Sequence, residues 1–301
     1  MNYCLQYKNG ATVTIFAPYD CGNKCPFCVN KKEYQADATF DIDKVLDSIK
    51  KMDAITPNCD FVITGGEPFA DLKSLDKILS LISGINAVHN CIGNTGHKVF
   101  INTTLPIGKY QEMEIIDFIN MHSKVITGLN VSRHIRKYVE ECDDKIFYYI
   151  NVPVRINCVL YEEKDATKIT RLIDRFSHFD CVSGFQIRED YTGTTVDNLY
   201  ELEENSCFAK CVEILNSKQQ LFSYFENNLI FGNDFRWNCR LAENISYHRT
   251  LPYSCIIKTK GKEINDIIIN PRGVILDDWN DYGQELDLEK YKAAVKEKRN
   301  G

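Results

Sequence analysis

Three cysteines near the start of the chain are spaced as ligands of one inorganic site. They are Cys21, Cys25 and Cys28 in the segment CGNKCPFC, separated by three and then two residues. Thiolates this close in a loop can enclose one iron–sulfur cluster, and three of them leave one iron of a [4Fe–4S] cluster open to another ligand. The spacing alone also fits a zinc site completed by a distant cysteine or histidine, or cysteines that bind nothing.

A second motif, FVITGGEPF, follows one expected strand later. Gly65, Gly66 and Glu67 come directly after its apolar run. Glycines at the end of a strand let the backbone approach a ligand closely, and a carboxylate there can meet a cation. Such a tripeptide alone is more typical of a turn without a ligand. Its position one strand and helix after the cysteine segment favours the binding interpretation.

Together the two motifs resemble those of the radical S-adenosylmethionine superfamily, over roughly residues 12–190. The signature of that family is three cysteines at this spacing with an aromatic residue, here Phe27, before the last. The resemblance implies that the open iron binds the amino and carboxylate groups of S-adenosylmethionine. An electron from the cluster then cleaves the cofactor to methionine and a 5′-deoxyadenosyl radical, which abstracts hydrogen from a substrate. It also implies that Phe27 lies beside the adenine and that the Gly-Gly-Glu motif binds the methionine part.

Short β-rich apolar runs alternate with segments of helical period from residue 12 onward. This alternation predicts repeated βα units around a parallel sheet, with ligands at the carboxyl ends of the strands. Six units indicate an α/β fold, a partial (β/α)6 TIM-like barrel. The expected strands are 12–17, 60–64, 98–103, 126–132, 153–160 and 182–188, and the expected helices are 42–52, 75–83, 111–122, 135–147, 166–179 and 199–215.

The pattern breaks after about residue 220. The segment through Arg249 shows no regular period, and CIIKTKGKEINDIIINPRGVILDDW then predicts two or three strands joined by glycine-containing turns. We therefore expect residues 1–219 to form the radical S-adenosylmethionine barrel and residues 220–301 to form a mainly-β extension that caps or closes it. Closure would keep a radical away from water and stray hydrogen donors.

Several expected strands carry polar side chains at alternate positions, although buried parallel strands usually read as continuous apolar runs. We interpret these side chains as lining a lumen that holds cofactor, substrate and water. The alternative is an internal network in which they satisfy one another. The resemblance implies cofactor binding by Asn102, Thr103, Ser132, Arg133, Arg155 and Asn157.

The end of the sixth expected strand carries a second set of candidates. Arg188 and Tyr191 are candidate catalytic residues, because the end of this strand is expected to face the substrate. Tyr191 could relay a hydrogen atom there. His134 is more typical of a loop histidine than of a base. The resemblance is nearest to the molybdenum-cofactor cyclase and peptide-modifying branch, but the cyclase's terminal glycine tail and second cysteine motif are absent from the sequence.

The later cysteines leave one question open. Cys207 and Cys211 lie one helical turn apart, and with Cys239 and Cys255 they are the candidates for an auxiliary cluster, without matching a compact auxiliary motif. Free cysteine is among the most buried residue types, so the remaining ones are expected to be packing residues: Cys4, Cys59, Cys91, Cys142, Cys158 and Cys181.

Composition narrows the class of protein. A formal charge of −6 over 301 residues argues against broad binding to nucleic acid. No apolar run is long enough for a signal peptide or a membrane span. We expect a cytoplasmic location, where the thirteen cysteines are thiols or metal ligands rather than disulfides.

These observations predict an oxygen-sensitive enzyme that holds a [4Fe–4S] cluster and S-adenosylmethionine. A small molecule in a polar lumen is the expected substrate, and a reductant such as a flavodoxin or ferredoxin is the expected electron donor. Two alternatives stay open. One is radical modification or activation of a peptide or protein; the other is a non-catalytic metal-binding or electron-transfer protein with a fourth protein ligand.

Overall fold

The structure is a computed structural model, and it describes seventeen segments of the chain in two compact units. The described residues are 3–5, 12–16, 21–23, 25, 28, 40–56, 58–105, 112–135, 141–160, 163–189, 207–217, 222–229, 232–239, 244–248, 262–264, 266–277 and 284–300. The first unit comprises Met1–Gly22, Cys28–Leu129 and Lys258–Gly301. The second comprises Asn23–Phe27 and Asn130–Ile257.

Six strands follow one another both in the chain and in the main sheet. They are β2 (Thr12–Phe16), β3 (Asp60–Thr64), β4 (Lys98–Thr103), β5 (Gly128–Ser132), β6 (Val154–Leu160) and β7 (Val182–Glu189). The pairs β2–β3, β3–β4 and β6–β7 are parallel. Among the described residues the full strand order is β13-β12-β2-β3-β4-β5-β6-β7-β10-β9-β8. The predicted succession of strands is therefore confirmed.

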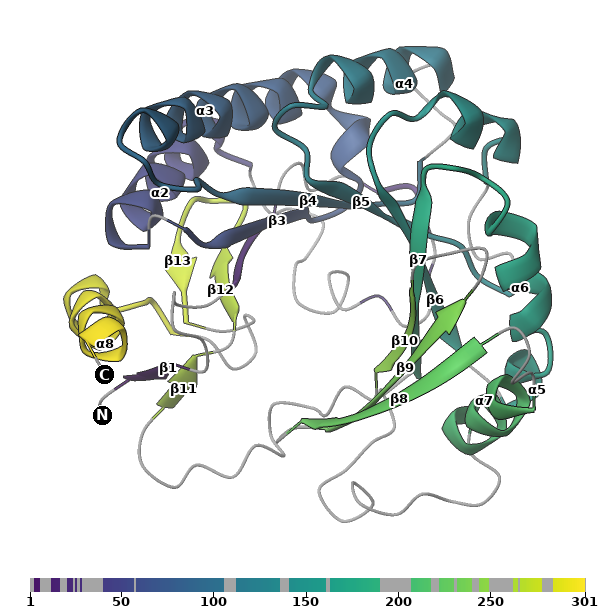
Figure 1. The fold of residues 1–301 in the computed structure, drawn as a ribbon. Coiled ribbons are helices and arrows are strands. Elements are labelled where there is room, and N and C mark those ends of the chain that lie inside the picture. The colour runs from purple at the N-terminus through teal and green to yellow at the C-terminus, as the bar shows by residue number, and fades with distance from the viewer. Residues whose placement is uncertain are drawn as a thin grey trace. The chain divides into compact units, whose positions relative to one another are not determined.

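Helices α2 (Ile42–Ile55) and α3 (Leu72–Cys91) lie along one face of β3 and β4 in the first unit (Figure 1). Each begins at an aspartate whose carboxylate accepts a backbone hydrogen bond from the first turn. Apolar residues at helical spacing, such as Val45, Ile49 and Met52, are fully buried. The 3-10 helix η1 (Pro68–Ala70) precedes α3, and α4 (Glu112–Met121) follows β4.

The chain beyond residue 258 completes the first unit. Strand β12 (Asp266–Ile269) pairs in parallel with β2, and β13 (Ile275–Leu276) pairs antiparallel with β12. Asn270 forms the predicted turn, because its side-chain oxygen accepts hydrogen bonds from two later backbone amides. A separate pair of strands, β1 (Tyr3–Leu5) and β11 (Lys262–Ile264), and helix α8 (Leu288–Asn300) complete the unit.

In the second unit α5 (Glu163–Ala166) and α6 (Ile169–Phe176) follow β6, and α7 (Cys207–Asn216) follows β7. Three further strands extend the sheet beyond β7. Strand β10 (Asn244–His248) pairs in parallel with β7, β9 (Gly232–Cys239) pairs antiparallel with β10, and β8 (Phe222–Leu229) pairs antiparallel with β9. The expectation of an irregular segment through Arg249 is therefore wrong. Its polar, asparagine-rich strands lack the apolar alternation on which strand prediction depends.

The predicted helix over 135–147 is also not formed in its described part. Residues 144–149 instead form the short 3-10 helix η2 (Asp144–Tyr149). The carboxylate of Asp143 accepts a hydrogen bond from the amide of Lys145, 3.0 Å away. Consecutive aspartates favour such local caps over a continuous helix.

Residues 220–301 supply strands to both units. The expected domain boundary at residue 219 stays a prediction. No helix in the described part of the chain combines the length and the apolar character needed to cross a membrane.

Candidate functional site

The three motif cysteines lie between β2 and α2, just beyond the carboxyl end of the first barrel strand. All three side chains are partly exposed. Cys21 and Cys28 belong to the first unit and Cys25 to the second. Phe27 lies outside the described residues.

Buried cysteines elsewhere in the chain differ from these three. Burial raises the pKa of Cys59 and of Cys158 to about 12, so both stay protonated thiols. Cluster ligands must be thiolates, so these two buried thiols are poor candidates for ligands. Cys142 is buried as predicted, and Cys211, a candidate ligand of an auxiliary cluster, is buried too. Cys91, expected to be a packing residue, is exposed at the end of α3.

The Gly-Gly-Glu motif forms a tight turn at the carboxyl end of β3. Gly65 is buried with a φ of 123°, a conformation that side-chain-bearing residues rarely adopt. Glu67 is only 3% exposed, and its carboxylate accepts four hydrogen bonds. The donors are the amide of Phe69 at 3.2 Å, the hydroxyl of Thr103 at 2.6 Å, and the amide and hydroxyl of Thr104, both at 2.8 Å. The turn after β3 is therefore tied to the end of β4.

These bonds use the hydrogen-bonding capacity of the Glu67 carboxylate. A carboxylate offers about four acceptor positions, and protein donors occupy that number here. Burial raises the pKa of Glu67, and the hydrogen bonds from Thr103 and Thr104 oppose the shift. Thr104 was not predicted as a site residue, although the two threonines at the end of an apolar strand are a signal for it. The side chain of Glu67 therefore holds the turn together.

Polar side chains of β6 and β7 in the second unit are bonded differently. Asn157 and Gln186 are direct register partners, so their side chains lie on one face, which Arg155 shares. Three buried atoms on this face have no hydrogen-bond partner among the described residues: Arg155 Nε, Asn157 Oδ1 and Gln186 Oε1. An unpartnered buried polar atom costs about 1–3 kcal/mol. Three together on neighbouring strands are typical of a ligand-binding surface.

The same face carries positive charge. Burial first, and then the charge of Arg188, lower the pKa of Arg155 to about 10. Arg188 follows Gln186 by two residues on β7 and is exposed. Two guanidinium groups close enough to repel favour an anionic ligand group between or beside them. Tyr191 lies outside the described residues.

Arg133 follows β5 and is completely buried. Its Nη1 donates to the carbonyl of Ser132 at 2.9 Å, its Nη2 donates to Cys142 Sγ at 3.1 Å, and its guanidinium lies 5.5 Å from the ring centre of Phe147. The structure therefore places this side chain inside the unit. Ser132 itself is partly exposed at the end of β5, as is Asn102 on β4.

His134 is buried and neutral. Burial, and next the charge of Arg133, lower its pKa to about 4. Its Nδ1 accepts a hydrogen bond from the amide of Val159, 3.2 Å away. A histidine whose acceptor nitrogen is already bonded to the backbone fits the interpretation as a structural residue.

Known proteins resemble this chain in two ways. Residues 9–131, which include the three cysteines and the Gly-Gly-Glu turn, match the family profile described as a 4Fe-4S single cluster domain. No curated protein sequence matches. The crystal structure of Streptococcus suis SuiB is similar, with a TM-score of 0.57 and 15% identity over 96% of this chain and 68% of SuiB.

Two further SuiB structures match equally well. The one bound to S-adenosylmethionine has a TM-score of 0.59 and 14% identity over 93% of this chain and 65% of that one. The one bound to the precursor peptide SuiA has a TM-score of 0.56 and 13% identity over 96% and 66%. The chain thus spans about two thirds of the length of SuiB. The predicted fold class is confirmed, and the family profile agrees with the predicted [4Fe–4S] cluster.

Proposed function

We propose, from the premise that this chain is a member of the radical S-adenosylmethionine superfamily, that it is an enzyme which cleaves S-adenosylmethionine reductively and acts on a bound substrate. The thiolates of Cys21, Cys25 and Cys28 would hold three irons of a [4Fe–4S] cluster and leave the fourth open. When bound, the cluster supplies the electron that cleaves the cofactor's sulfonium to methionine and a 5′-deoxyadenosyl radical, which abstracts hydrogen from the substrate.

The Gly65–Gly66 backbone is the part of the turn that we assign to the methionine end of the cofactor. The acceptor positions of Glu67 are already used by protein donors, whereas glycine backbone permits close approach. Thr103 and Arg133 would support the site indirectly, because the Thr103 hydroxyl and both terminal nitrogens of the Arg133 guanidinium bond to protein atoms. Asn102 and Ser132 remain our candidates for direct cofactor contacts, together with Phe27.

The unpartnered polar row on β6 and β7 is the observation that carries the binding proposal. Arg155, Asn157 and Gln186 would have their buried atoms satisfied by a ligand rather than by the protein. With Arg188 they would orient an anionic group, either the carboxylate of the cofactor or an acid on the substrate. We propose Arg188 and Tyr191 as the residues nearest the reacting substrate.

A small molecule is the substrate that the sequence favoured. A peptide is the second candidate, and what supports it is that one similar structure, SuiB, holds its precursor peptide SuiA. Either substrate would need an electron donor such as a flavodoxin or ferredoxin. A cluster with an open iron is oxygen-labile, which fits the cytoplasmic location that we propose.

The test is anaerobic reconstitution with iron and sulfide, followed by dithionite and S-adenosylmethionine, with chromatography for 5′-deoxyadenosine. We expect the product from the wild-type protein and none from Cys25→Ala. Cys91→Ala is the matched control, because that thiol is exposed at the end of α3; Cys142 is unsuitable because it accepts a hydrogen bond from Arg133. Cleavage by Cys25→Ala, or a site that binds only zinc, would overturn the proposal.

A further inference from the structure

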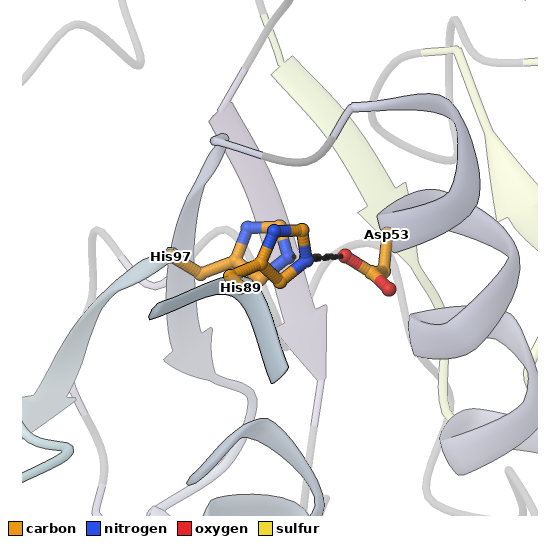
Figure 2. A group of neighbouring side chains, drawn as sticks. All are labelled: Asp53, His89 and His97. Atoms are coloured by element: carbon orange, nitrogen blue, oxygen red, sulfur yellow. Dashed lines mark hydrogen bonds and ion pairs between the residues drawn. The ribbon is translucent and has the colours of Figure 1, made fainter. Parts of the chain in front are cut away.

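We propose that Asp53, His89 and His97 form a second metal site, which binds one transition-metal ion of the Zn²⁺ class. The three residues come from α2, from α3 and from the segment just before β4, all in the first unit. Figure 2 shows both imidazole rings turned toward the carboxylate of Asp53. None of the three residues belongs to the cysteine motif or to the polar row of β6 and β7.

The ligand atoms converge. His89 Nε2 lies 2.7 Å and His97 Nε2 lies 2.9 Å from the same oxygen, Asp53 Oδ1, and the candidate ligand atoms all lie within 4.8 Å of one another. A tetrahedral zinc ion with bonds of about 2.0–2.2 Å keeps its ligand atoms about 3.3 Å apart. An outward movement of about 0.5 Å would therefore admit an ion in place of the two N–H protons.

The donor set selects the kind of ion. Two neutral imidazoles and one carboxylate suit zinc and its borderline neighbours, whereas calcium and magnesium take oxygen ligands. The side chain of His97 is 0% exposed and that of His89 9%, but that of Asp53 is 24% exposed. The site is thus dry on its histidine side and reaches solvent at the carboxylate, where water can supply a fourth ligand.

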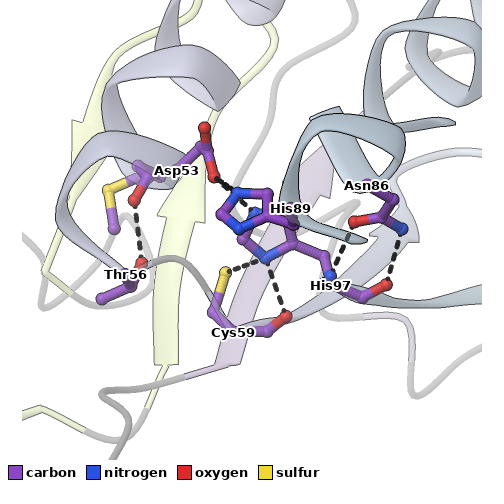
Figure 3. Close-up of polar contacts among 7 residues, drawn as sticks. Asp53, Thr56, Cys59, Asn86, His89 and His97 are labelled. Carbon is purple, nitrogen blue, oxygen red and sulfur yellow. Dashed lines mark hydrogen bonds and ion pairs between the residues drawn. The ribbon is translucent and has the colours of Figure 1, made fainter. Parts of the chain in front are cut away.

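A shell of fixed contacts orients His97 (Figure 3). Its Nδ1 lies 3.2 Å from the carbonyl of Cys59, the outer contact that a metal-ligating histidine typically makes through its other nitrogen. Asn86 binds the backbone of His97 on both sides, with hydrogen bonds of 2.7 and 2.9 Å. The ring of Phe61 lies 4.7 Å from the imidazole, centre to centre. Such support keeps the imidazole aimed at Asp53.

Cys59 Sγ does not join the ligand set. It lies 3.4 Å from His97 Nδ1, on the side of the ring away from Nε2. Together with the two histidine contacts to Asp53, it completes a hydrogen-bonded network that needs no metal, which is the competing account. That network leaves His89 Nδ1 buried without a partner among the described residues.

The place of the cluster in the unit indicates its role. Cys59 immediately precedes β3 and His97 immediately precedes β4, so the site lies at the amino ends of these strands. The Gly65 turn and Thr103 lie at their carboxyl ends, where barrel enzymes do their chemistry, whereas residues at the amino end of a barrel act on stability. The ion would therefore join α2, α3 and the start of β4 and leave the reaction unaffected.

Zinc binding to tag-free, chelator-treated protein already loaded with its iron–sulfur cluster tests the proposal, since the motif cysteines are then occupied. We expect one zinc ion per chain, with a zinc-edge X-ray absorption spectrum showing nitrogen and oxygen ligands and no sulfur at about 2.3 Å. This measurement needs no variant. Absence of bound zinc, or zinc bound only through sulfur, would sink the proposal.

Variants then locate the ion. Asp53→Asn and His89→Gln should each weaken zinc binding more than about 100-fold, because losing even an outer partner of a ligand weakens binding about 10–100-fold. Asn86→Ala should weaken it about 10-fold. His122→Gln is the matched control: it removes a histidine 3.0 Å from the carboxylate of Asp76, a pair that no third candidate ligand joins within the described ranges. Equal zinc affinity in Asp53→Asn and wild type would contradict the assignment.

Thermal unfolding gives an independent readout. Zinc at about 100 times its Kd should raise the Tm of the wild-type protein by roughly 5 °C. The Tm of His89→Gln should not respond. An equal rise in both proteins would place the zinc elsewhere and refute the site. Cleavage of S-adenosylmethionine should be the same with and without zinc, so the two proposals fail separately.

Discussion

Glu67 in the first unit and Gln186 in the second are buried almost equally, at 3% and 4% exposed, yet their polar atoms have different surroundings. Four protein donors surround the carboxylate of Glu67. The oxygen of Gln186, like that of its neighbour Asn157, has no partner among the described residues. The first arrangement satisfies its carboxylate within the protein, whereas the second leaves acceptor atoms open, which supports the proposal that a ligand binds there.

The difference suggests that the two regions have different roles in the proposed function. A turn that must present its backbone to a cofactor benefits from being fixed before the cofactor arrives. Side chains that recognise a ligand must instead keep their hydrogen-bonding capacity open, at a cost in stability. The polar row on β6 and β7 would then recognise a ligand through side chains, and the turn after β3 would present fixed backbone.

Removing the carboxylate of Glu67 should have the largest effect. Glu67→Ala leaves the amides of Phe69 and Thr104 and the hydroxyls of Thr103 and Thr104 without their acceptor. We expect a loss of about 3–5 kcal/mol in the free energy of unfolding, measured by urea denaturation. Glu67→Gln keeps the shape and one acceptor oxygen and should lose about 1–3 kcal/mol. A loss below about 1 kcal/mol in Glu67→Ala would show that the turn is not supported in this way.

Acid should destabilise the second unit through His134. Its pKa is about 4 when folded, against 6.5 for an exposed histidine, so the unfolded state binds its proton first as the pH falls. The stabilisation is complete above pH 6.5 and is lost progressively down to about pH 4, for a total of roughly 3 kcal/mol.

Cluster-free protein avoids acid damage to the cluster in this measurement. The free energy of unfolding of the wild type, minus that of His134→Asn, should shrink as the pH falls from about 7 to 4. Parallel pH profiles for the two proteins would contradict a depressed pKa.

Replacing a polar atom that lacks a partner should have the smallest effect on stability. Gln186→Leu should change the free energy of unfolding by less than about 1 kcal/mol, because it removes an unsatisfied buried group. Thr103→Val, the matched substitution in the satisfied network, should cost about 1–3 kcal/mol. Gln186→Leu should nevertheless weaken the binding of S-adenosylmethionine or of the substrate. Equal destabilisation by the two substitutions would contradict the proposed difference between the satisfied and the unpartnered polar groups.

The core of the fold could be predicted because its local signals are strong. Strands β3 and β4 follow from apolar runs such as FVIT and KVFIN, and α2 follows from the spacing of Val45, Ile49 and Met52. Strands β8 to β10 could not, because their sequences are polar and their pairing is set by β7 and by one another. Tertiary context overrides weak propensity in such strands.

The candidate site was predictable only where it is contiguous in sequence. The cysteines and the Gly-Gly-Glu turn are short motifs that can be recognised without a structure. The bonds from Thr103 and Thr104 to Glu67 depend on the pairing of β3 with β4. The convergence of Asp53 with His89 and His97 depends on how α2 and α3 pack, and the spacing of these residues in the sequence does not predict it.

The pairing of β2 with β12 has a consequence for synthesis on the ribosome. Thr12 is synthesised about 250 residues before its neighbour in the sheet, Asp266. At about 5–20 residues per second that interval lasts roughly 12–50 seconds. One edge of β2 therefore lacks its partner strand for that interval. A chaperone would have most to protect there.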